Sequence, residues 1–346
     1  MSKTLQDYAT LINDTIQSNE INHYITTDNM CQNLGGIDTF KNINIPQGKV
    51  RSFQKDDVLL SNIRLYFRKV YRAKQKGGCS SDVLVFRAKH IDSATLFAIL
   101  SSQIFTDYAC SGSQGSKMPR GNKTHMMDFK IPTINFTIAK IFNSIQNKIE
   151  NNHKINELLH TLAYKIYEYY FKYKPKNAKL EQIIIENPKS SIMVKNAQKT
   201  QDKYPFFTSG NNILFYPKAI IDGRNCFLNT GGNAGIKFYV GKASYSTDTW
   251  CICANEFSDY LYLLLSSIKT HINQSFFQGT SLKHLQKNLL KKYPIYMPST
   301  HEIKKFNQII MPLLTLISIN TRTSKKLEQI RDFLLPLLLK QQVKPQ

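Results

Sequence analysis

A basic segment at residues 64–76 is the first feature of this sequence that could carry chemistry. It reads RLYFRKVYRAKQK, and its six basic residues, which include Arg64, Arg68, Lys69 and Arg72, have aromatic side chains between them. Basic side chains neutralise phosphate groups, whereas flat and amide side chains contact base edges. The pattern suits a nucleic-acid surface, and it suits a solvated strand face on a basic protein equally well.

A second candidate is the segment SGSQGSKMPRGNK at 111–123, which contains three glycines, one proline and no acidic residue. This composition excludes regular structure and predicts a loop. A flexible cationic loop can approach the DNA backbone closely, and an ordinary surface turn is the alternative. We predict DNA contacts from the polar and basic side chains of this loop, which are Gln114, Ser116, Lys117, Arg120, Asn122 and Lys123.

The second half of the chain offers weaker candidates. Residues 230–247 contain GGNAG, which has neither the G-x-G-x-x-G spacing nor a P-loop, so we expect a hairpin with its turn near 233–235. Residues 278–288 (QGTSLKHLQKN) resemble the start of a helix capped by Thr280 or Ser281. From this cluster the candidate DNA contacts are Thr280, Ser281, Lys283 and Lys287.

Catalytic motifs are missing from the sequence. It has no HExxH, no GxSxG, no kinase motif set, no zinc-deaminase signature and no adenosylmethionine-binding motif. The eight histidines are isolated, and the six cysteines form no CxxC pair. We therefore predict no catalytic residue and no metal site, and we expect free thiols in a reducing compartment.

The two halves of the chain share four features in the same order, at an offset of about 165 residues. Asp82 and Asp248 each precede an apolar strand, LFAILSS corresponds to LYLLLSS, Gly115 and Gly279 each precede a hydroxyl residue, and KIPTI corresponds to YMPST. Strand-rich stretches lie between these features and suggest mixed α and β structure. The sequence therefore predicts a duplicated module.

A long helical pattern with heptad character follows each module. The first helix is expected from about Ile134 to Tyr173, roughly 55 to 60 Å long. Pro312 and Pro336 are expected to kink or end the second helix. The two helices pair most simply with each other, and ordinary domain packing is the alternative. The predicted seam residues are Ile138, Ile145, Asn152, Ile155, Leu159, Leu162, Ile317, Asn320, Leu327 and Leu334.

The fold class predicted from these patterns is α+β: two pseudo-repeated mixed α/β globular domains separated by two long helices that form an antiparallel coiled coil. The predicted ranges are 1–134 and 175–299 for the domains, and 135–174 and 300–346 for the helices. The chain has 346 residues, with 46 Lys and Arg against 24 Asp and Glu, a net charge of +22. Such charge favours a polyanionic partner, although an AT-rich genome could also produce it. Without a signal-peptide pattern or a long apolar run, we expect a cytoplasmic protein without a membrane partner.

Two long runs carry a family resemblance. LLSNIRLYFRKVYRAKQKGGCSSDVLVFR (59–87) and SGSQGSKMPRGNKTHMMDFKIP (111–132) resemble the target-recognition domain of type I restriction-modification specificity subunits. YPFFTSGN (204–211) and LNTGGNAGIKFYVGKASYSTDTW (228–250) resemble a second, divergent domain of that family. The resemblance assigns the loop contacts of the family to Lys117, Arg120 and Lys123. Further candidates within the second domain are Ser209, Asn211, Lys237 and Lys242.

The resemblance implies a non-catalytic subunit of a larger complex. Each of two target-recognition domains would read one half of a split site in double-stranded DNA, about 16 base pairs apart if the helical rod sets the distance. The helices would dock two methyltransferase subunits, and a restriction and translocase subunit would join them. S-adenosylmethionine, ATP and magnesium would belong to these partner subunits. The alternative is a non-enzymatic coiled-coil adaptor or scaffold whose basic charge is incidental.

Overall fold

The computed structural model describes residues 3–38, 43–197, 203–210 and 213–339. The chain forms two compact units. Unit 1 comprises residues 1–150 and 327–346, and unit 2 comprises residues 151–326. The boundary falls inside both long helices, α5 (Phe136–Phe171) and α9 (Thr300–Leu338), so each unit contains a part of each helix. The four domain ranges predicted from the sequence stay predictions.

Unit 1 contains two four-stranded sheets, with strand orders β1-β8-β5-β6 and β2-β4-β7-β3. Every neighbouring pair of strands is antiparallel except β3 and β7. Besides the long helices, its elements are α1 (Leu5–Tyr8), β1 (Ala9–Ile12), β2 (Thr15–Gln17), η1 (Ser18–Glu20), β3 (Tyr24–Ile25), β4 (Lys49–Phe53), β5 (Val58–Ser61), η2 (Leu65–Phe67), β6 (Val70–Arg72), β7 (Gly77–Cys79), β8 (Val83–Ala88), α2 (Ser93–Leu100), α3 (Gln103–Ser111) and α4 (Lys123–Met127).

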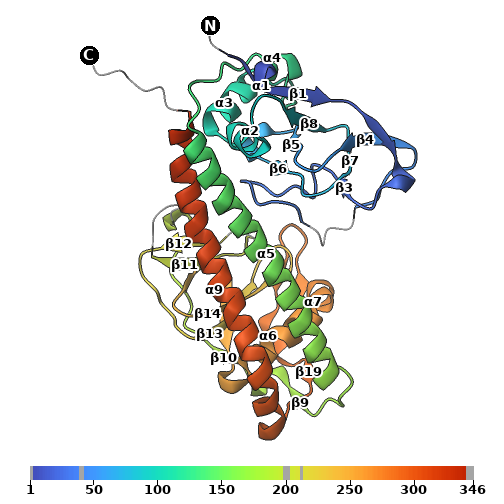
Figure 1. The fold of residues 1–346 in the computed structure, drawn as a ribbon. Helices are drawn as coiled ribbons and strands as arrows, with labels where there is room; N and C mark the ends of the chain where they lie inside the picture. The colour runs from blue at the N-terminus through green and yellow to red at the C-terminus, as the bar shows by residue number, and fades with distance from the viewer. Residues whose placement is uncertain (1–2, 39–42, 198–202, 211–212, 340–346) are drawn as a thin grey trace. The chain divides into compact units, whose positions relative to one another are not determined.

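The core of unit 1 lies on both faces of the β1-β8-β5-β6 sheet. Leu59 and Val85 point to one face and pack with Phe53 of the second sheet. The opposite face packs against α2 and α3, which lie beside the sheet (Figure 1). Asp92 caps α2 by accepting a hydrogen bond from the backbone N–H of Thr95 at 2.9 Å. Almost every side chain of α2 is buried, as expected for a helix that is apolar on all sides.

Unit 2 repeats the first sheet of unit 1. Its strand order β10-β16-β13-β14 corresponds strand for strand to β1-β8-β5-β6, and a three-stranded sheet β12-β11-β15 accompanies it. Its elements are β9 (Ala178–Lys179), η3 (Leu180–Gln182), β10 (Ile185–Glu186), η4 (Val194–Asn196), β11 (Tyr204–Phe207), β12 (Leu214–Tyr216), β13 (Arg224–Asn229), β14 (Ile236–Val240), β15 (Ser244–Tyr245), β16 (Thr249–Cys253), η5 (Asn255–Phe257), α6 (Ser258–Ser267), α7 (Lys269–Ser275), β17 (Phe277–Gln278), β18 (His284–Leu285), α8 (Lys287–Lys291) and β19 (Pro294–Ile295).

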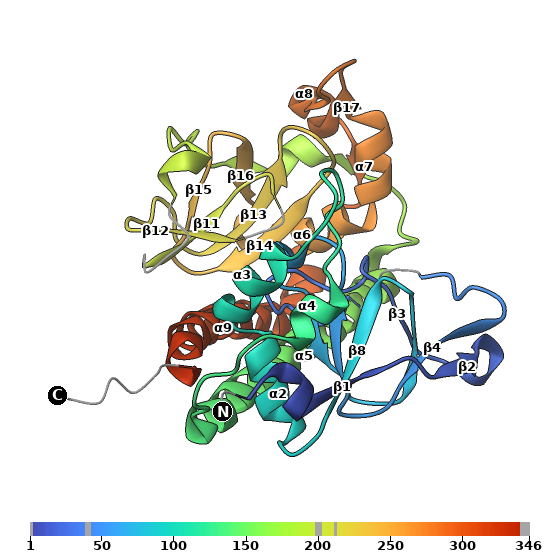
Figure 2. The ribbon, with the colours of Figure 1, turned by 90° about the horizontal axis from the view of Figure 1, so that it is seen from above.

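The hairpin expected around GGNAG is present in unit 2. Strands β13 and β14 are antiparallel neighbours, with Leu228 opposite Ile236 and the turn between them. Helix α6 covers one face of this sheet (Figure 2), and its leucines join Leu228 and Ile252 in the largest apolar cluster of the unit. The predicted fold class, mixed α and β structure with two long helices that pack together, is confirmed.

Within each unit, the parts of α5 and α9 lie side by side and run antiparallel (Figure 1). In unit 1, the guanidinium of Arg331 donates to Oε1 of Gln146 at 2.9 Å. In unit 2, the side-chain amide of Asn152 donates to Oγ of Ser324 at 3.1 Å, and both residues are buried. The polar interruption predicted at Asn152 therefore lies at the contact between the two helices.

One sequence prediction about these helices is wrong, at two positions. Ile155 and Leu162 are 42% and 48% exposed, so the buried face of α5 does not pass through them. That face contains alanines, aromatics and amides as well as aliphatic residues, and a count of aliphatic residues alone placed it incorrectly. Pro312 was expected to kink or end the second helix. It does not end it, because α9 is continuous from Thr300 to Leu338, and a kink there stays a prediction.

The remaining predicted seam residues are at least half-buried. Ile317 is buried, like Asn152. The residues with intermediate burial are Ile138, Ile145, Leu159, Asn320, Leu327 and Leu334.

Candidate nucleic-acid interface

The basic loop of unit 1 forms a closed turn, which we call the first tip (residues 114–120). The backbone N–H of Gln114 donates to the carbonyl of Arg120 at 2.9 Å, and the N–H of Arg120 donates to the carbonyl of Gln114 at 2.8 Å. Gly115 has a φ of 99°, a conformation that residues with a side chain rarely adopt. The glycine-rich composition that excluded a regular element therefore supplies the turn between two paired positions.

The loop that follows β5 holds the first tip in place. The N–H of Arg64 donates to the carbonyl of Pro119 at 2.9 Å, and the N–H of Gly121 donates to the carbonyl of Asn62 at 3.1 Å. The guanidinium of Arg64 also donates to the carbonyl of Lys117 at 3.2 Å. A side chain at position 121 would collide with neighbouring side chains, so this close approach needs glycine.

Unit 2 carries an equivalent turn, the second tip (residues 278–284). Gln278 and His284 are paired across the short hairpin of β17 and β18. The N–H of Gly232 donates to the carbonyl of Lys283 at 2.9 Å, and the N–H of Leu285 donates to the carbonyl of Thr230 at 3.0 Å. The loop that follows β13 thus holds the second tip as the loop that follows β5 holds the first.

The second tip corrects the prediction of a helix start at 278–288. Thr280 and Ser281 cap no helix, because they lie in the turn between β17 and β18, and α8 begins only at Lys287. Gly279 has a φ of 141°, and a Cβ atom there would lie 2.4 Å from the carbonyl oxygen of Leu282. This conformation turns the chain back into a hairpin, so a helix cannot begin there.

The tips expose several of the predicted contact residues. In the first tip, Gln114, Ser116 and Lys117 are exposed; in the second, Thr280, Ser281 and Lys283 are exposed. Each tip also exposes one large apolar side chain, Met118 or Leu282, at 57% in both cases. Neither residue is among the contacts predicted from the sequence.

Three predicted contacts at the edges of the first tip have other partners or positions. Arg120 forms an ion pair with Asp82 at 2.9 Å, although its side chain is 62% exposed. Asn122 caps α4 by accepting from the N–H of His125 at 3.1 Å. Lys123 is exposed at the first residue of α4. The exposed charge of Arg120 and Lys123 still adjoins the tip.

The basic segment 64–76 is engaged mainly inside unit 1. Arg68 donates to the carbonyl of Ser101 at 2.9 Å, and burial lowers the pKa of its guanidinium. Lys69 donates to the carbonyl of Thr27, and Arg72 lies 3.8 Å from Asp56. Arg64 and Arg68 have φ values of 50° and 49° and flank η2. These contacts give the segment a supporting role beneath the tip.

Two predicted contacts of unit 2 are held by their own unit. The ammonium of Lys237 donates to the carbonyl of Thr208 at 2.7 Å, and burial, with Lys269 nearby, lowers its pKa to about 8. Ser209 donates to the carbonyl of Asp248. Asn211 lies outside the described residues.

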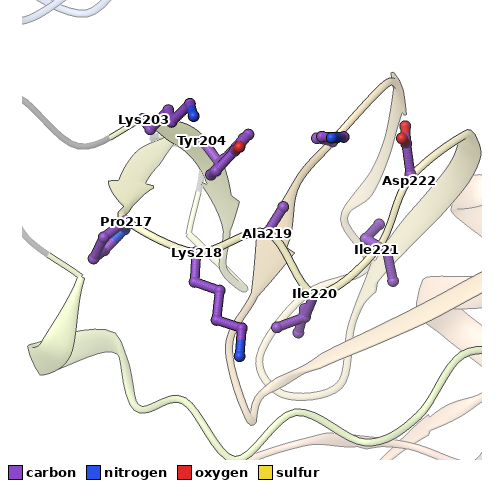
Figure 3. A pocket seen from close by; sticks show the side chains of 9 residues that line it. Lys203, Tyr204, Pro217, Lys218, Ala219, Ile220, Ile221 and Asp222 are labelled. Carbon is purple, nitrogen blue, oxygen red and sulfur yellow. The ribbon is translucent and has the colours of Figure 1, made fainter.

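The other two predicted lysines of unit 2 line hollows in its surface. Lys242 is exposed and lines a pocket of about 490 Å³. Lys203 and Lys218 line the same pocket (Figure 3). Lys287 lies over the ring of Trp250, with its ammonium 5.2 Å from the ring centroid, and burial lowers its pKa. The carboxylate of Glu186 accepts from the indole N–H of Trp250 at 2.8 Å, which fixes that ring. Lys242 is therefore available to an anion, whereas Lys287 is partly engaged.

Neither unit offers a metal centre or a membrane span among its described residues. No group of three or more His, Cys, Asp or Glu side chains that could hold a metal occurs in the ranges that the structure covers. Within the same ranges, no helix has both the length and the apolar character needed to cross a bilayer.

Comparison with a family model identifies the second half of the chain. Residues 176–329 match the model described as "Type I restriction modification DNA specificity domain". This segment is similar to a type I DNA specificity domain. The match includes the second tip and most of unit 2, and it bears out the resemblance seen in the sequence. A specificity domain of this kind is not a catalytic domain.

A solved structure with the same fold is known, and a second one aligns less closely. The S subunit of a type I restriction-modification system from M. genitalium aligns with a TM-score of 0.65 at 14% identity, over 99% of this chain and 96% of that one. The HsdS subunit from Thermoanaerobacter tengcongensis aligns over 98% of this chain and 96% of that one, at 12% identity with a TM-score of 0.37. A search of curated proteins found no match. The chain therefore has the fold of the S subunit from M. genitalium, and its residues 176–329 match the model of a type I DNA specificity domain.

Proposed function

We propose that the protein is the DNA specificity subunit of a type I restriction-modification complex and recognises a bipartite site in double-stranded DNA. The observation that carries this proposal is the pair of equivalent tips, one in each unit, each held by the loop after the equivalent strand, β5 or β13, of two sheets with the same strand order. The type I specificity domain at 176–329 contains one of them. Each tip would read one half-site, and because the two tips differ in sequence, the half-sites would differ as well.

The charge of the chain supports DNA as the partner. A net charge of +22 gives a long-range attraction for a polyanion. The exposed Lys117 and Lys283 would contact phosphates beside the bases, while Gln114 and Gln278 offer amide groups for base edges. Arg64, whose guanidinium holds the carbonyl of Lys117, would position the first tip.

The exposed face of α5 in unit 2 supports the partner assignment. Ile155, Leu158 and Leu162 are 42%, 62% and 48% exposed and recur at helical spacing. Apolar side chains in such a stripe are typical of a helix that packs against another protein. We assign this stripe to one of two methyltransferase subunits. A restriction and translocase subunit completes the complex, and S-adenosylmethionine, ATP and magnesium belong to these partners.

The test is DNA binding by the complex reconstituted with its methyltransferase subunits. Methylome sequencing of the host reports the split motif, and gel shifts then compare a duplex carrying that motif with one in which either half is scrambled. We expect tight binding only to the intact motif, and a steep loss of affinity as salt is raised from 50 to 200 mM, because bound phosphates release counterions. Binding without sequence preference, or association with partners that is insensitive to salt and independent of DNA, would instead indicate a coiled-coil adaptor.

A further inference from the structure

The two tips correspond to each other residue for residue. At one constant offset, Gln114 corresponds to Gln278, Gly115 to Gly279 and Met118 to Leu282. The backbone follows the same correspondence, because Gln114 pairs with Arg120 as Gln278 pairs with His284. In each tip the atom nearest to a Cβ built on the glycine is the carbonyl oxygen of the apolar residue. The tips are therefore the same turn built twice.

Each turn places one large apolar side chain in solvent. Met118 and Leu282 are both 57% exposed, while the residues around them in each tip are mainly polar. In the first tip the apolar residue follows Ser116 and Lys117, and in the second it lies between Ser281 and Lys283. An apolar side chain at the end of an anchored polar turn contributes little to the core of its own unit. Its repetition at the equivalent position of the second turn calls for a common partner.

Double-stranded DNA presents one apolar group on its base edges, the C5-methyl group of thymine in the major groove. That groove is about 12 Å wide and accommodates a two-stranded turn. Resting on the proposed function, we propose that Met118 and Leu282 are specificity-determining residues, each of which contacts a thymine methyl group in its own half-site. The hydroxyl and ammonium groups beside them bind neighbouring polar base edges and phosphates.

The two tips differ in the polar side chains beside the apolar residue, so each would recognise different polar base edges around the shared thymine contact. Pro119 of the first tip corresponds to Lys283 of the second, and Arg120 corresponds to His284. Asp82 holds Arg120 at 2.9 Å and so limits the positions that its guanidinium can take. One backbone turn thus carries two sets of donors, and the thymine contact is the element that the half-sites have in common.

The experiment compares thymine with deoxyuridine, which lacks only the methyl group. The reconstituted complex is titrated with duplexes of the motif from the methylome in which the thymines of one half-site are replaced by deoxyuridine. The wild-type complex should lose about fourfold in affinity for each contacted methyl group. Met118→Ala should bind the thymine and deoxyuridine forms of the first half-site equally, yet still distinguish them in the second. Leu282→Ala should show the reverse, and Met118→Leu should retain discrimination.

Lys117→Ala is the matched control, because it removes the adjacent charge and leaves the apolar side chain. It should weaken binding to thymine and deoxyuridine duplexes alike and reduce the dependence of affinity on salt. The inference is overturned, with the proposed function intact, if Met118→Ala stays as sensitive to deoxyuridine as the wild type, or if deoxyuridine has no effect on the wild type. A half-site without thymine in either strand would also overturn it. A wild-type complex without any sequence preference refutes the proposed function itself.

Discussion

Replacement of Arg331 should destabilise unit 1, because this residue is a buried cation in the helix pair of that unit. Its side chain is only 2% exposed. Its guanidinium donates to Oε1 of Gln146 at 2.9 Å and to the carbonyl of Asn33 at 3.3 Å, and it forms an ion pair with Asp332 at 3.0 Å. Asn33 has a φ of 53°, so Arg331 helps to fix a strained loop of unit 1 to the helix pair.

Arg331→Met keeps most of the buried volume and removes the donors. Two acceptors, Oε1 of Gln146 and the carbonyl of Asn33, then lose their partner in a buried place. Each such loss costs about 1–3 kcal/mol, so unit 1 should be destabilised by about 2–6 kcal/mol. With a urea m-value of about 2 kcal/mol per molar, the midpoint of unfolding should fall by about 1–3 M.

The chain provides a way to assign the loss to unit 1. Its one tryptophan, Trp250, lies in unit 2, so tryptophan fluorescence follows that unit, while far-UV circular dichroism follows both units. Arg331→Met should shift the circular dichroism transition to lower urea and leave the fluorescence transition near its wild-type midpoint. An unchanged circular dichroism midpoint, or an equal shift of both signals, would contradict the reasoning.

A double-mutant cycle separates the hydrogen bond from packing. Gln146→Met combined with Arg331→Met removes donor and acceptor together, so the double variant should be less destabilised than the sum of the single variants by about 1–3 kcal/mol. Full recovery is not expected, because Gln146 also donates to the carbonyl of Leu34 at 2.8 Å. Strict additivity would mean that the contact contributes nothing.

Three further predictions concern pH, the tips and partner binding. Burial lowers the pKa of His160, whose Nδ1 lies 3.3 Å from the hydroxyl of Tyr262. The unfolded state therefore binds the proton first as the pH falls, and unit 2 should lose stability below pH 6.5. In that range the urea midpoint measured by fluorescence should depend less on pH in His160→Phe than in the wild type or in His301→Gln, a control at an exposed histidine. Gly279→Ala should weaken binding to the second half-site more than Gly115→Ala weakens binding to the first, because the added Cβ at 279 would lie 2.4 Å from a carbonyl oxygen. The Cβ at 115 would lie 3.5 Å from its nearest neighbour, so that variant adds only about 1–2 kcal/mol of backbone strain, and equal effects in gel shifts would contradict this difference. The double variant Leu158→Glu, Leu162→Glu should no longer co-elute with the methyltransferase subunit in size-exclusion chromatography, while its unfolding midpoint stays unchanged. The control Thr161→Glu, on the adjacent face of α5, should co-elute normally. Co-elution of the double variant would show that the stripe is not part of the interface.

The sequence was sufficient to predict the duplication, because the duplication is visible as a repeated order of local sequence patterns. The order of apolar strand, apolar helix and Gly-hydroxyl turn repeats, and the matching strand orders β1-β8-β5-β6 and β10-β16-β13-β14 agree with it. The same comparison could have identified the second tip. Gln278 and Leu282 lie at the same offset from Gln114 and Met118 as Gly279 does from Gly115. The helix start predicted at 278–288 was inferred from the hydroxyl residues, whereas the conformation of the glycine beside them determines the turn.

The partners of the basic segment depend on tertiary contacts, and the sequence could not supply them. Arg68 and Lys69 donate to the carbonyls of Ser101 and Thr27, which are distant in sequence. Whether a cation is available to DNA or engaged by a backbone carbonyl is decided by the packing of loops. The heptad count failed at Ile155 and Leu162 for a related reason, since α5 buries residues against its own domain as well as against α9.

The polar residues between α5 and α9 in unit 2 have a consequence for how the helices are aligned. The amide of Asn156 donates to Oγ1 of Thr321 at 3.3 Å and its carbonyl oxygen accepts from the amide of Asn320 at 3.0 Å, next to the contact between Asn152 and Ser324. Moving one helix past the other by a turn would bury these amides without partners, at a cost of about 1–3 kcal/mol each. Aliphatic residues at the same positions would stabilise several alignments almost equally. The amides thus give up some apolar stabilisation and select one alignment of α5 against α9 in unit 2.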